Sequence, residues 1–352
     1  MKYITRENLA RLLNVLKKDY RVFVPVKKEE TGNYPIKQGA QRFYAEYDKM
    51  TDDVVIGEVR PFEPLKAFFT RAKEKVAEGF SPESPHEDDK PFAIVGVKAC
   101  DLKGFKIQDF VFKDHDYKDP FYIKNREENL IISADCTCAI ETCFCLAAGI
   151  KPYPEEDFDI NLSEINGGFL VETGSEKGKD IVNGNASLFQ EAKPELASRR
   201  EKLREKTSRE VEENIKETEV PSQEKLEGVI ERNFESDIWD DEAKTCVECG
   251  ACTIICPTCH CFLLYDEKSG DSMARMRIWD SCMLKHYARV AGGENPRGKL
   301  WMRLRNRFEK KFDYFPKVAQ VYACTGCGRC ISACPAKIDI RKVLKRLVES
   351  NG

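Results

Sequence analysis

The N-terminal half of the chain alternates between short apolar runs and amphipathic stretches. Leu9, Leu12, Leu13 and Leu16 recur at helical spacing, which predicts a helix over residues 6–18. A further helix is predicted at Glu63–Glu78. Runs rich in β-branched and aromatic residues predict strands, and these runs are Tyr20–Val26, Phe43–Tyr47, Val54–Val59, Phe92–Val97, Leu130–Ser133 and Gly168–Glu172. Strands that alternate with helices are typical of an α/β domain, which we place at residues 1–185.

The middle of the chain has few apolar positions. From Glu191 to about Glu235 it is rich in Lys, Arg and Glu, and it is interrupted by Pro194 and Pro221. Both signs of charge alternate at i,i+4 spacing, which favours a solvated helix over a binding tail. We therefore expect a charged helical connector over residues 186–237.

Composition limits the class of protein and its compartment. The chain has 352 residues, 41% of them hydrophobic, and a net charge of −3, so a buried core is expected and general attraction to nucleic acid is not. The N-terminus lacks the apolar segment of a signal peptide, and no run approaches the roughly 18 apolar residues of a membrane span. We expect a cytoplasmic protein whose sixteen cysteines stay reduced and available to metal.

Eight of these cysteines form two copies of the motif C-x₂-C-x₂-C-x₃-C-P. The copies are Cys246, Cys249, Cys252, Cys256, Pro257 and Cys324, Cys327, Cys330, Cys334, Pro335. This spacing wraps three thiolates around one 4Fe–4S cluster, and the fourth cysteine ligates the neighbouring cluster. Cys334 would then complete the first cluster and Cys256 the second. Structural zinc, the alternative, gives no reason for a third cysteine, a fourth and a proline at fixed offset, twice.

The two motifs are separated by more residues than a small two-cluster ferredoxin needs. Arg275–Ala291 has an amphipathic pattern that predicts a helix in the gap, and a last helix is predicted at Asp339–Val348. This favours an α-helical ferredoxin domain over the small β-hairpin type. The sequence thus predicts an α+β protein, with an N-terminal α/β domain followed by a C-terminal α-helical ferredoxin domain over residues 238–352 that carries two cubane clusters.

A further group of thiols lies in the α/β domain. Its members follow two predicted strands, and they are Cys100, Cys136, Cys138, Cys143 and Cys145. Strand ends at one edge of an α/β sheet are where ligand sites collect. We assign Cys100, Cys136, Cys143 and Cys145 to a third iron–sulfur cluster and leave Cys138 spare. A zinc site and free buried thiols are the alternatives.

Three cysteines remain after these assignments. Cys259, Cys261 and Cys282 are expected to pack around the clusters, with a ligand role for Cys259 or Cys261 as the alternative. His260 is expected to donate a hydrogen bond near a cluster rather than to ligate it.

Several segments resemble one family of redox subunits. In the C-terminal half they are Cys256-Pro-Thr-Cys-His-Cys-Phe262, Trp279-Asp-Ser-Cys282, Ala291-Gly-Gly293 and Cys324-x-x-Cys-Gly-Arg-Cys330. Upstream they are Gly96-Val-Lys-Ala-Cys100-Asp-Leu102, Thr142-Cys-Phe-Cys145 and Gly174-Ser-Glu-Lys-Gly178. From about residue 92 onward the chain resembles the beta subunits of cytoplasmic nickel–iron sulfhydrogenases and the related A subunit of anaerobic sulfite reductase. The family usually has Arg-Pro where this chain has Lys98-Ala99.

The resemblance implies an electron-relay subunit between a flavin-containing, NAD(P)H-oxidising subunit and a catalytic hydrogenase or reductase subunit. The residues agree with a non-catalytic chain, because no G-x-G-x-x-G follows a strand and Leu300 stands where a phosphate loop needs Ser or Thr. The alternative is a catalytic oxidoreductase that binds flavin or substrate in its N-terminal domain. Whether the catalytic partner is a nickel–iron hydrogenase, a sirohaem sulfite reductase or another reductase stays open.

The segment Lys299–Lys317 is basic and has interleaved aromatic residues, a pattern that nucleic-acid binders also show. It leads directly into the second cluster motif, however, and a four-thiolate cluster is anionic. Basic residues there can raise the reduction potential of a cluster or form a partner interface. We therefore expect no nucleic-acid partner.

Overall fold

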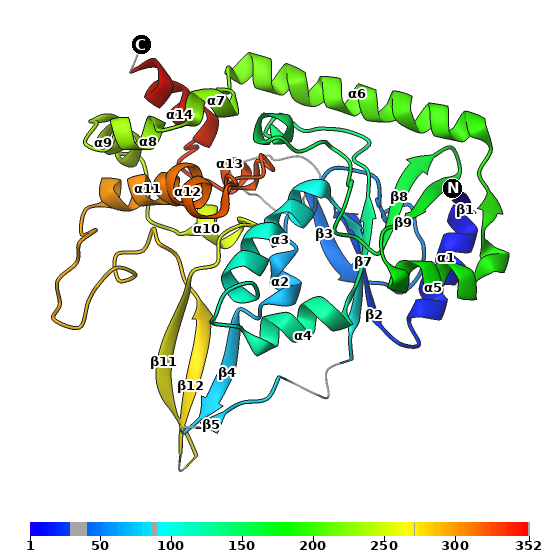
Figure 1. Cartoon of the computed structure of the whole chain (residues 1–352), viewed down its shortest axis with the longest axis horizontal. Helices are drawn as coiled ribbons and strands as arrows, with labels where there is room; N and C mark the ends of the chain where they lie inside the picture. Colours follow the sequence, from blue (N-terminus) through cyan, green and yellow to red (C-terminus); the bar gives the residue numbers. More distant parts are fainter. Residues whose placement is uncertain (29–40, 80, 86–89, 271, 351–352) are drawn as a thin grey trace.

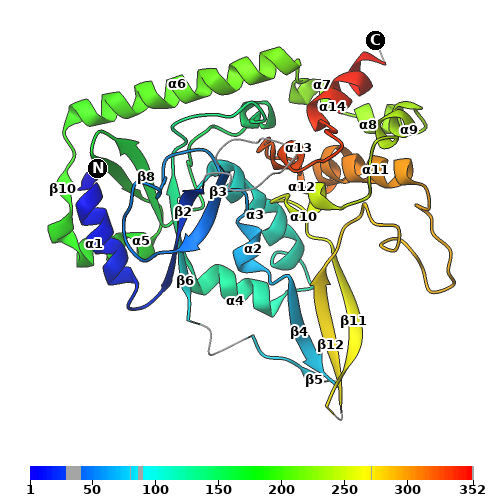
Figure 2. The same cartoon turned by 180° about the vertical axis from the view of Figure 1, so that it is seen from behind.

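The computed structural model of the chain describes residues 1–28, 41–79, 81–85, 90–270 and 272–350. An α/β body lies at one end of an elongated molecule and a cluster of short helices lies at the other (Figure 1). The long helix α6 (Pro194–Thr218) connects the two ends, and a narrow four-stranded sheet projects from the middle (Figure 2). The mixed fold class predicted from the sequence is confirmed.

The body is built on an eight-stranded sheet with the order β10-β1-β9-β8-β7-β6-β2-β3. Its central strands β2, β6, β7 and β8 are parallel, and the outer pairs are antiparallel. The bounds are β1 Lys2–Thr5, β2 Arg21–Lys28, β3 Gln41–Glu46, β6 Phe92–Val97, β7 Leu130–Ala134, β8 Ile160–Ile165, β9 Gly168–Thr173 and β10 Gln190–Glu191. Most of the predicted strands are therefore present, whereas the sequence missed β1, β8 and β10.

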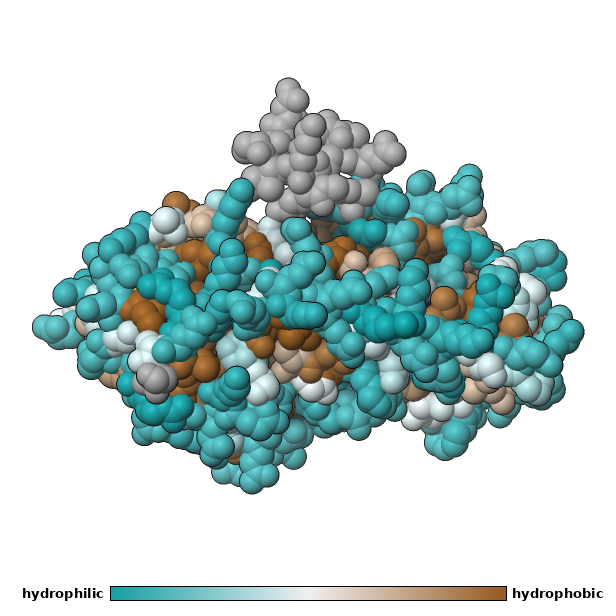
Figure 3. Space-filling view, turned by 90° about the horizontal axis from the view of Figure 1, so that it is seen from above, coloured by the Kyte–Doolittle hydropathy of each residue, from teal (hydrophilic) through white to brown (hydrophobic). Residues whose placement is uncertain are grey.

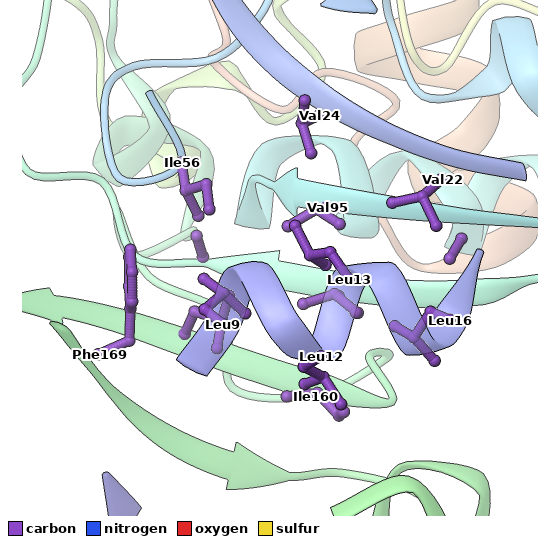
Figure 4. Packing of buried hydrophobic residues seen from close by; sticks show 14 of the residues in the cluster. Leu9, Leu12, Leu13, Leu16, Val22, Val24, Ile56, Val95, Ile160 and Phe169 are labelled. Carbon is purple, nitrogen blue, oxygen red and sulfur yellow. The ribbon is translucent and has the colours of Figure 1, made fainter. Parts of the chain in front are cut away.

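Helices cover both faces of this sheet, as the near-continuous apolar sequence of its parallel strands requires. On one face, α1 (Arg6–Leu16) buries its four leucines against Val22, Val95 and Ile160, together with α5 (Glu176–Gly184) (Figure 4). On the other face, α2 (Lys66–Phe69), α3 (Ala99–Phe112) and α4 (Pro120–Glu128) pack against Ile94, Val97 and Ile131. The sheet is thus held rigidly, and the C-terminal ends of β6 and β7 both lead into cysteine-bearing segments.

Two predicted helices and one predicted strand are wrong. Arg275–Ala291 is not a helix, because β12 (Ser272–Trp279) forms a hairpin with β11 (Phe262–Ser269) and the following residues are turns. Glu63–Glu78 contains only the short α2 before β4 (Lys73–Glu78), which pairs with β12 and with β5 (Ser81–Pro82). Val54–Val59 is a buried loop joined to the sheet by one bridge, Val26 to Val54.

The remaining C-terminal residues form short helices around a core that contains Trp239 and Phe308. These helices are α7 Gln223–Leu226, α8 Val229–Arg232, α9 Ile238–Ala243, α10 Ala251–Ile254, α11 Leu300–Glu309, α12 Phe315–Ala319, α13 Arg329–Ser332 and α14 Ile340–Glu349. A short π-helical turn, Lys310–Tyr314, joins α11 to α12. The last helix matches its prediction, with Asp339 as the N-cap.

The charged connector contains the 25-residue helix α6. Hydrophilic residues dominate the face of the molecule on which α6 lies (Figure 3). The buried side of α6 is nevertheless specific, because Thr207 donates to the carbonyl of Cys136 and Asn214 to that of Ile140. None of the helices in the described part of the chain has the length and apolarity needed to cross a membrane.

Candidate iron–sulfur sites

The two cysteine motifs fold in the same way. In each, a glycine in the left-handed region follows the second cysteine, Gly250 at φ +71° and Gly328 at φ +70°. A one-turn helix then carries the third cysteine, α10 in the first motif and α13 in the second, and the two helices pack against each other. This internal repeat presents two equivalent thiol loops face to face.

The first thiol group joins both motifs. Cys246, Cys249, Cys252 and Cys334 line one cavity, which Leu304, Arg307 and Ile338 close from the interior. The Ile338 amide donates to the Cys334 sulfur at 3.3 Å. Cys334 comes from the second motif, so the structure brings together the four residues that the crossover rule selects.

The second thiol group contains Cys324, Cys327, Cys330 and Cys256. Here the second motif supplies three cysteines and the first motif supplies the fourth. Burial raises the pKa of Cys324 to about 11 and that of Cys330 to about 12, and the charge of Cys256 acts on both. Lys311 donates to the Cys256 sulfur at 3.3 Å and to the carbonyl of Ala323 at 3.0 Å. The Cys324 and Cys330 thiols therefore favour the protonated form unless positive charge or a metal cluster compensates their ionisation.

The third thiol group lies at the sheet edge that the sequence predicted. Cys100 begins α3 directly after β6, and the other members occupy the loop after β7; together Cys100, Cys136, Cys138, Cys143 and Cys145 line one cavity. Burial raises the pKa of Cys136 to about 12. Cys138, which the sequence left spare, lies in this cavity with the four predicted residues.

The third group is docked directly onto the second motif. The amide of Phe144 donates to the carbonyl of Gly326 at 2.8 Å, and Gly326 and Cys327 line the third cavity. A Cβ at Gly328 would overlap the carbonyl oxygen of Thr142. Glycine at this position therefore permits the close approach of the loop that carries Cys143 and Cys145, and the second group lies between the first and the third.

The arrangement of thiols fits a cluster better than a single ion. Among the residues that the structure describes, no three His, Cys, Asp or Glu side chains are grouped closely enough to hold one metal ion. The thiols instead surround cavities, which is the arrangement needed by a cubane whose irons each take one cysteine.

Buried positive charge accompanies the thiols. Five buried cationic residues make no ion pair with a carboxylate of the described chain, and they are Arg60, Lys66, Lys98, Arg307 and Lys311. Isolated buried charges are costly unless an opposite charge compensates them. Burial lowers the pKa of Lys66 and Lys98, while nearby cysteines act in the opposite direction. The donor set and its charges thus fit anionic thiolate-ligated clusters.

These cations were only partly readable from the sequence. Arg307 and Lys311 belong to the basic segment before the second motif, and Lys98 lies two positions before Cys100. No sequence signal identifies Arg60, which donates to the carbonyl of Cys327, or Lys66, which donates to that of Cys259 at 2.7 Å. Both come from the N-terminal half and hold loops of the C-terminal half.

The remaining cysteines lie near the two C-terminal groups. Cys259 is 3.7 Å from the Lys311 amine, and it lines a separate cavity with His260, Cys261 and Trp279. A hydrogen bond with Cys282 lowers the pKa of Cys261 to about 5. Burial lowers the pKa of His260 to about 4, and its ring packs against Phe112 and Phe315. These residues surround the cluster region, and their expected packing role stays a prediction.

Comparison with known proteins agrees with this architecture. Residues 245–338 match the family model of the 4Fe-4S dicluster domain. The chain is 31% identical over 354 residues to Sulfhydrogenase 2 subunit beta of Pyrococcus furiosus, and the alignment covers 99% of each chain. The similarity therefore includes residues 1–90, which the motifs did not reach, and the predicted resemblance is confirmed.

Proposed function

The chain belongs to the family of sulfhydrogenase beta subunits, and from this premise we propose that it relays electrons between a flavin-containing, NAD(P)H-oxidising subunit and a catalytic hydrogenase or reductase subunit. The observation that carries the proposal is the row of three thiol groups, in which the second lies against both of the others. Bound clusters supply one-electron transfer at such sites. The protein's own part is to ligate them, surround them with fixed charge and exclude water.

We assign three 4Fe–4S clusters to this row. The first would be held by Cys246, Cys249, Cys252 and Cys334, and the second by Cys324, Cys327, Cys330 and Cys256. The third would be held by Cys100, Cys136, Cys143 and Cys145, with Cys138 as the unused thiol of the same cavity. Cys100, Cys143 and Cys145 are buried, which favours them as ligands, whereas Cys136 and Cys138 are both half-buried, so the choice of Cys136 over Cys138 stays a prediction.

The two ends of the row differ in exposure, which bears on how partners connect. Of the sixteen cysteines, all of which the structure describes, Cys249 alone is exposed. Beside it, the Val247 residue is 64% exposed at the mouth of the same cavity. An apolar residue next to an exposed ligand supports the first group as the port at which a partner subunit exchanges electrons. The third group is covered by α6.

The test is to purify the chain anaerobically, load it with iron and sulfide, and follow its reduction by absorbance. We expect about twelve irons per chain, from three cubanes. The chain should accept electrons from dithionite but not from NADH or NADPH until a flavin-bearing partner subunit is added. Zinc without iron would contradict the cluster assignment. Bound flavin, or reduction of a dye by NAD(P)H with the single chain, would instead support the catalytic alternative.

A further inference from the structure

Arg307 lies between the first two thiol groups. It lies on α11 and is only 4% exposed. Its side chain lines the first cavity together with Cys246, Cys249, Cys252 and Cys334. Cys252 of the first group and Cys330 of the second lie on α10 and α13, which pack against each other, and both cysteines act electrostatically on Arg307. The residue is therefore shared by two sites rather than belonging to one.

The guanidinium of Arg307 lacks the carboxylate partners that the buried Arg303 and Arg329 have. Arg329 makes a two-pronged ion pair with Asp101 at 2.7 and 2.8 Å, and both side chains are fully buried. Arg303 pairs with Glu248 at 2.7 Å and donates to backbone carbonyls. Over the residues that the structure describes, Arg307 has no carboxylate partner, and its buried Nε donates to nothing.

A buried arginine in this state requires an anion within reach. An unsatisfied buried donor costs about 1–3 kcal/mol, and an uncompensated charge costs more. Burial acts to lower the pKa of Arg307, whereas negative charge at Cys252 and Cys330 acts to raise it, and an arginine guanidinium remains charged in either case. The chemical group that satisfies both the charge and the free N–H is a thiolate-ligated cluster in the cavity that Arg307 lines.

We propose that Arg307 is a shared counter-ion of the two C-terminal clusters, donating to sulfur in the first cavity and raising the reduction potential of both. This inference rests on the proposed function. Reduction adds one electron to a cluster that is already anionic, so a nearby cation stabilises the reduced form more than the oxidised form. Because one residue acts on both sites, it raises both potentials together and adds little to the difference between them.

Lys311 provides an internal contrast. Its amine touches Cys256 at 3.3 Å and Cys259 at 3.7 Å, so its closest sulfur contacts belong to the second group and its neighbour. Removal of Lys311 should therefore act mainly on the second cluster, whereas removal of Arg307 should act on both.

The experiment is a redox titration of the full, cluster-loaded chain, followed by electron paramagnetic resonance, with iron counted in the same samples. R307M should lower the potentials of both C-terminal clusters, each by at least a tenfold change in the equilibrium constant for reduction, which is 59 mV for one electron. R307K keeps the charge but loses the planar fork, so both potentials should fall by less. Iron content should stay at the wild-type value.

R305M is the matched control. Arg305 lies on the same helix but stacks on Phe234 and donates to its carbonyl, away from the thiols. The R305M variant removes the same formal charge as R307M. Both cluster potentials should move from their wild-type values by only a small fraction of the shift in R307M. Equal shifts in R305M and R307M, or a shift of one cluster alone in R307M, would overturn the shared role.

If R307M loses iron, the deciding variant is R307Q, which removes the charge but keeps an N–H donor, and two unchanged potentials in R307Q would overturn the proposal. A wild-type chain without cluster signals would instead refute the proposed function, and that failure is seen before any variant is made.

Discussion

The first and third thiol groups are assembled in opposite ways. The first is built almost entirely from one short motif and needs only Cys334 from the second motif. The third draws Cys100 from the end of β6 and its other thiols from the loop after β7, and it is closed by α6 and by the second motif. The first site therefore lies wholly within the C-terminal half, whereas the cavity of the third site takes its thiols from the N-terminal body and is completed by α6 and the docked second motif.

The most disruptive test of this contrast removes two thiols of the third group. C143A/C145A should lose about four irons, because two of four ligands are missing, while the resonance signals of the two C-terminal clusters persist. The single variant C138A is the control, and it should keep its iron. Retention of all iron in the double variant would refute the third site.

The docking of the two halves can be broken at the Asp101–Arg329 pair. D101N leaves Arg329 with an uncompensated charge in a fully buried position, which should lower the free energy of unfolding by about 3–5 kcal/mol. Denaturant unfolding of the loaded chain measures this. E267Q, which removes the exposed pair with Lys73, should change stability by less than about 1 kcal/mol. Comparable losses in both variants would mean that the buried pair does not join the halves.

Variants of the two repeated glycines distinguish the effect of backbone strain from the effect of docking the third group onto the second motif. G328A and G250A each place a side chain at a left-handed φ, which costs roughly 1–2 kcal/mol. Only in G328A does the new methyl group also overlap the carbonyl of Thr142. G328A should therefore weaken the signal of the third cluster, and G250A should not. Identical spectra from the two variants would indicate that this close approach does not hold the third site.

The smallest expected effect concerns the exposed end of the row. V247D places a charge at the mouth of the first cavity, and it should slow reduction by the partner subunit roughly fivefold, for a loss of about 1 kcal/mol in docking. Reduction by dithionite should stay unchanged. V318D is the control, because Val318 is equally exposed but does not line a thiol cavity. A partner-dependent rate that V247D leaves intact would place the port elsewhere.

The cluster motifs were readable from the sequence because their ligands lie three or four residues apart. At that spacing the chain itself dictates which thiols meet. The strands at Phe92–Val97 and Leu130–Ser133 were equally clear, since they are continuous apolar runs, and their ends predicted where the third group would lie. The predicted helix at Arg275–Ala291 failed for the opposite reason. Its apolar positions satisfy a helical period by coincidence, whereas pairing of β12 with β4, nearly 200 residues earlier, decides for a strand.

The sequence by itself therefore determined the cofactor class, the crossover of the two C-terminal groups and the alternation of the N-terminal body. Only the tertiary structure decided the order of the three groups in a row, the presence of Cys138 in the third cavity and the identity of the buried cations. The spacing of cysteines within a short motif predicts ligand geometry, because residues close in sequence have few alternative arrangements. Burial and charge compensation depend on which distant surfaces meet, so Arg60 and Lys66 acquire their roles only when the two halves pack together.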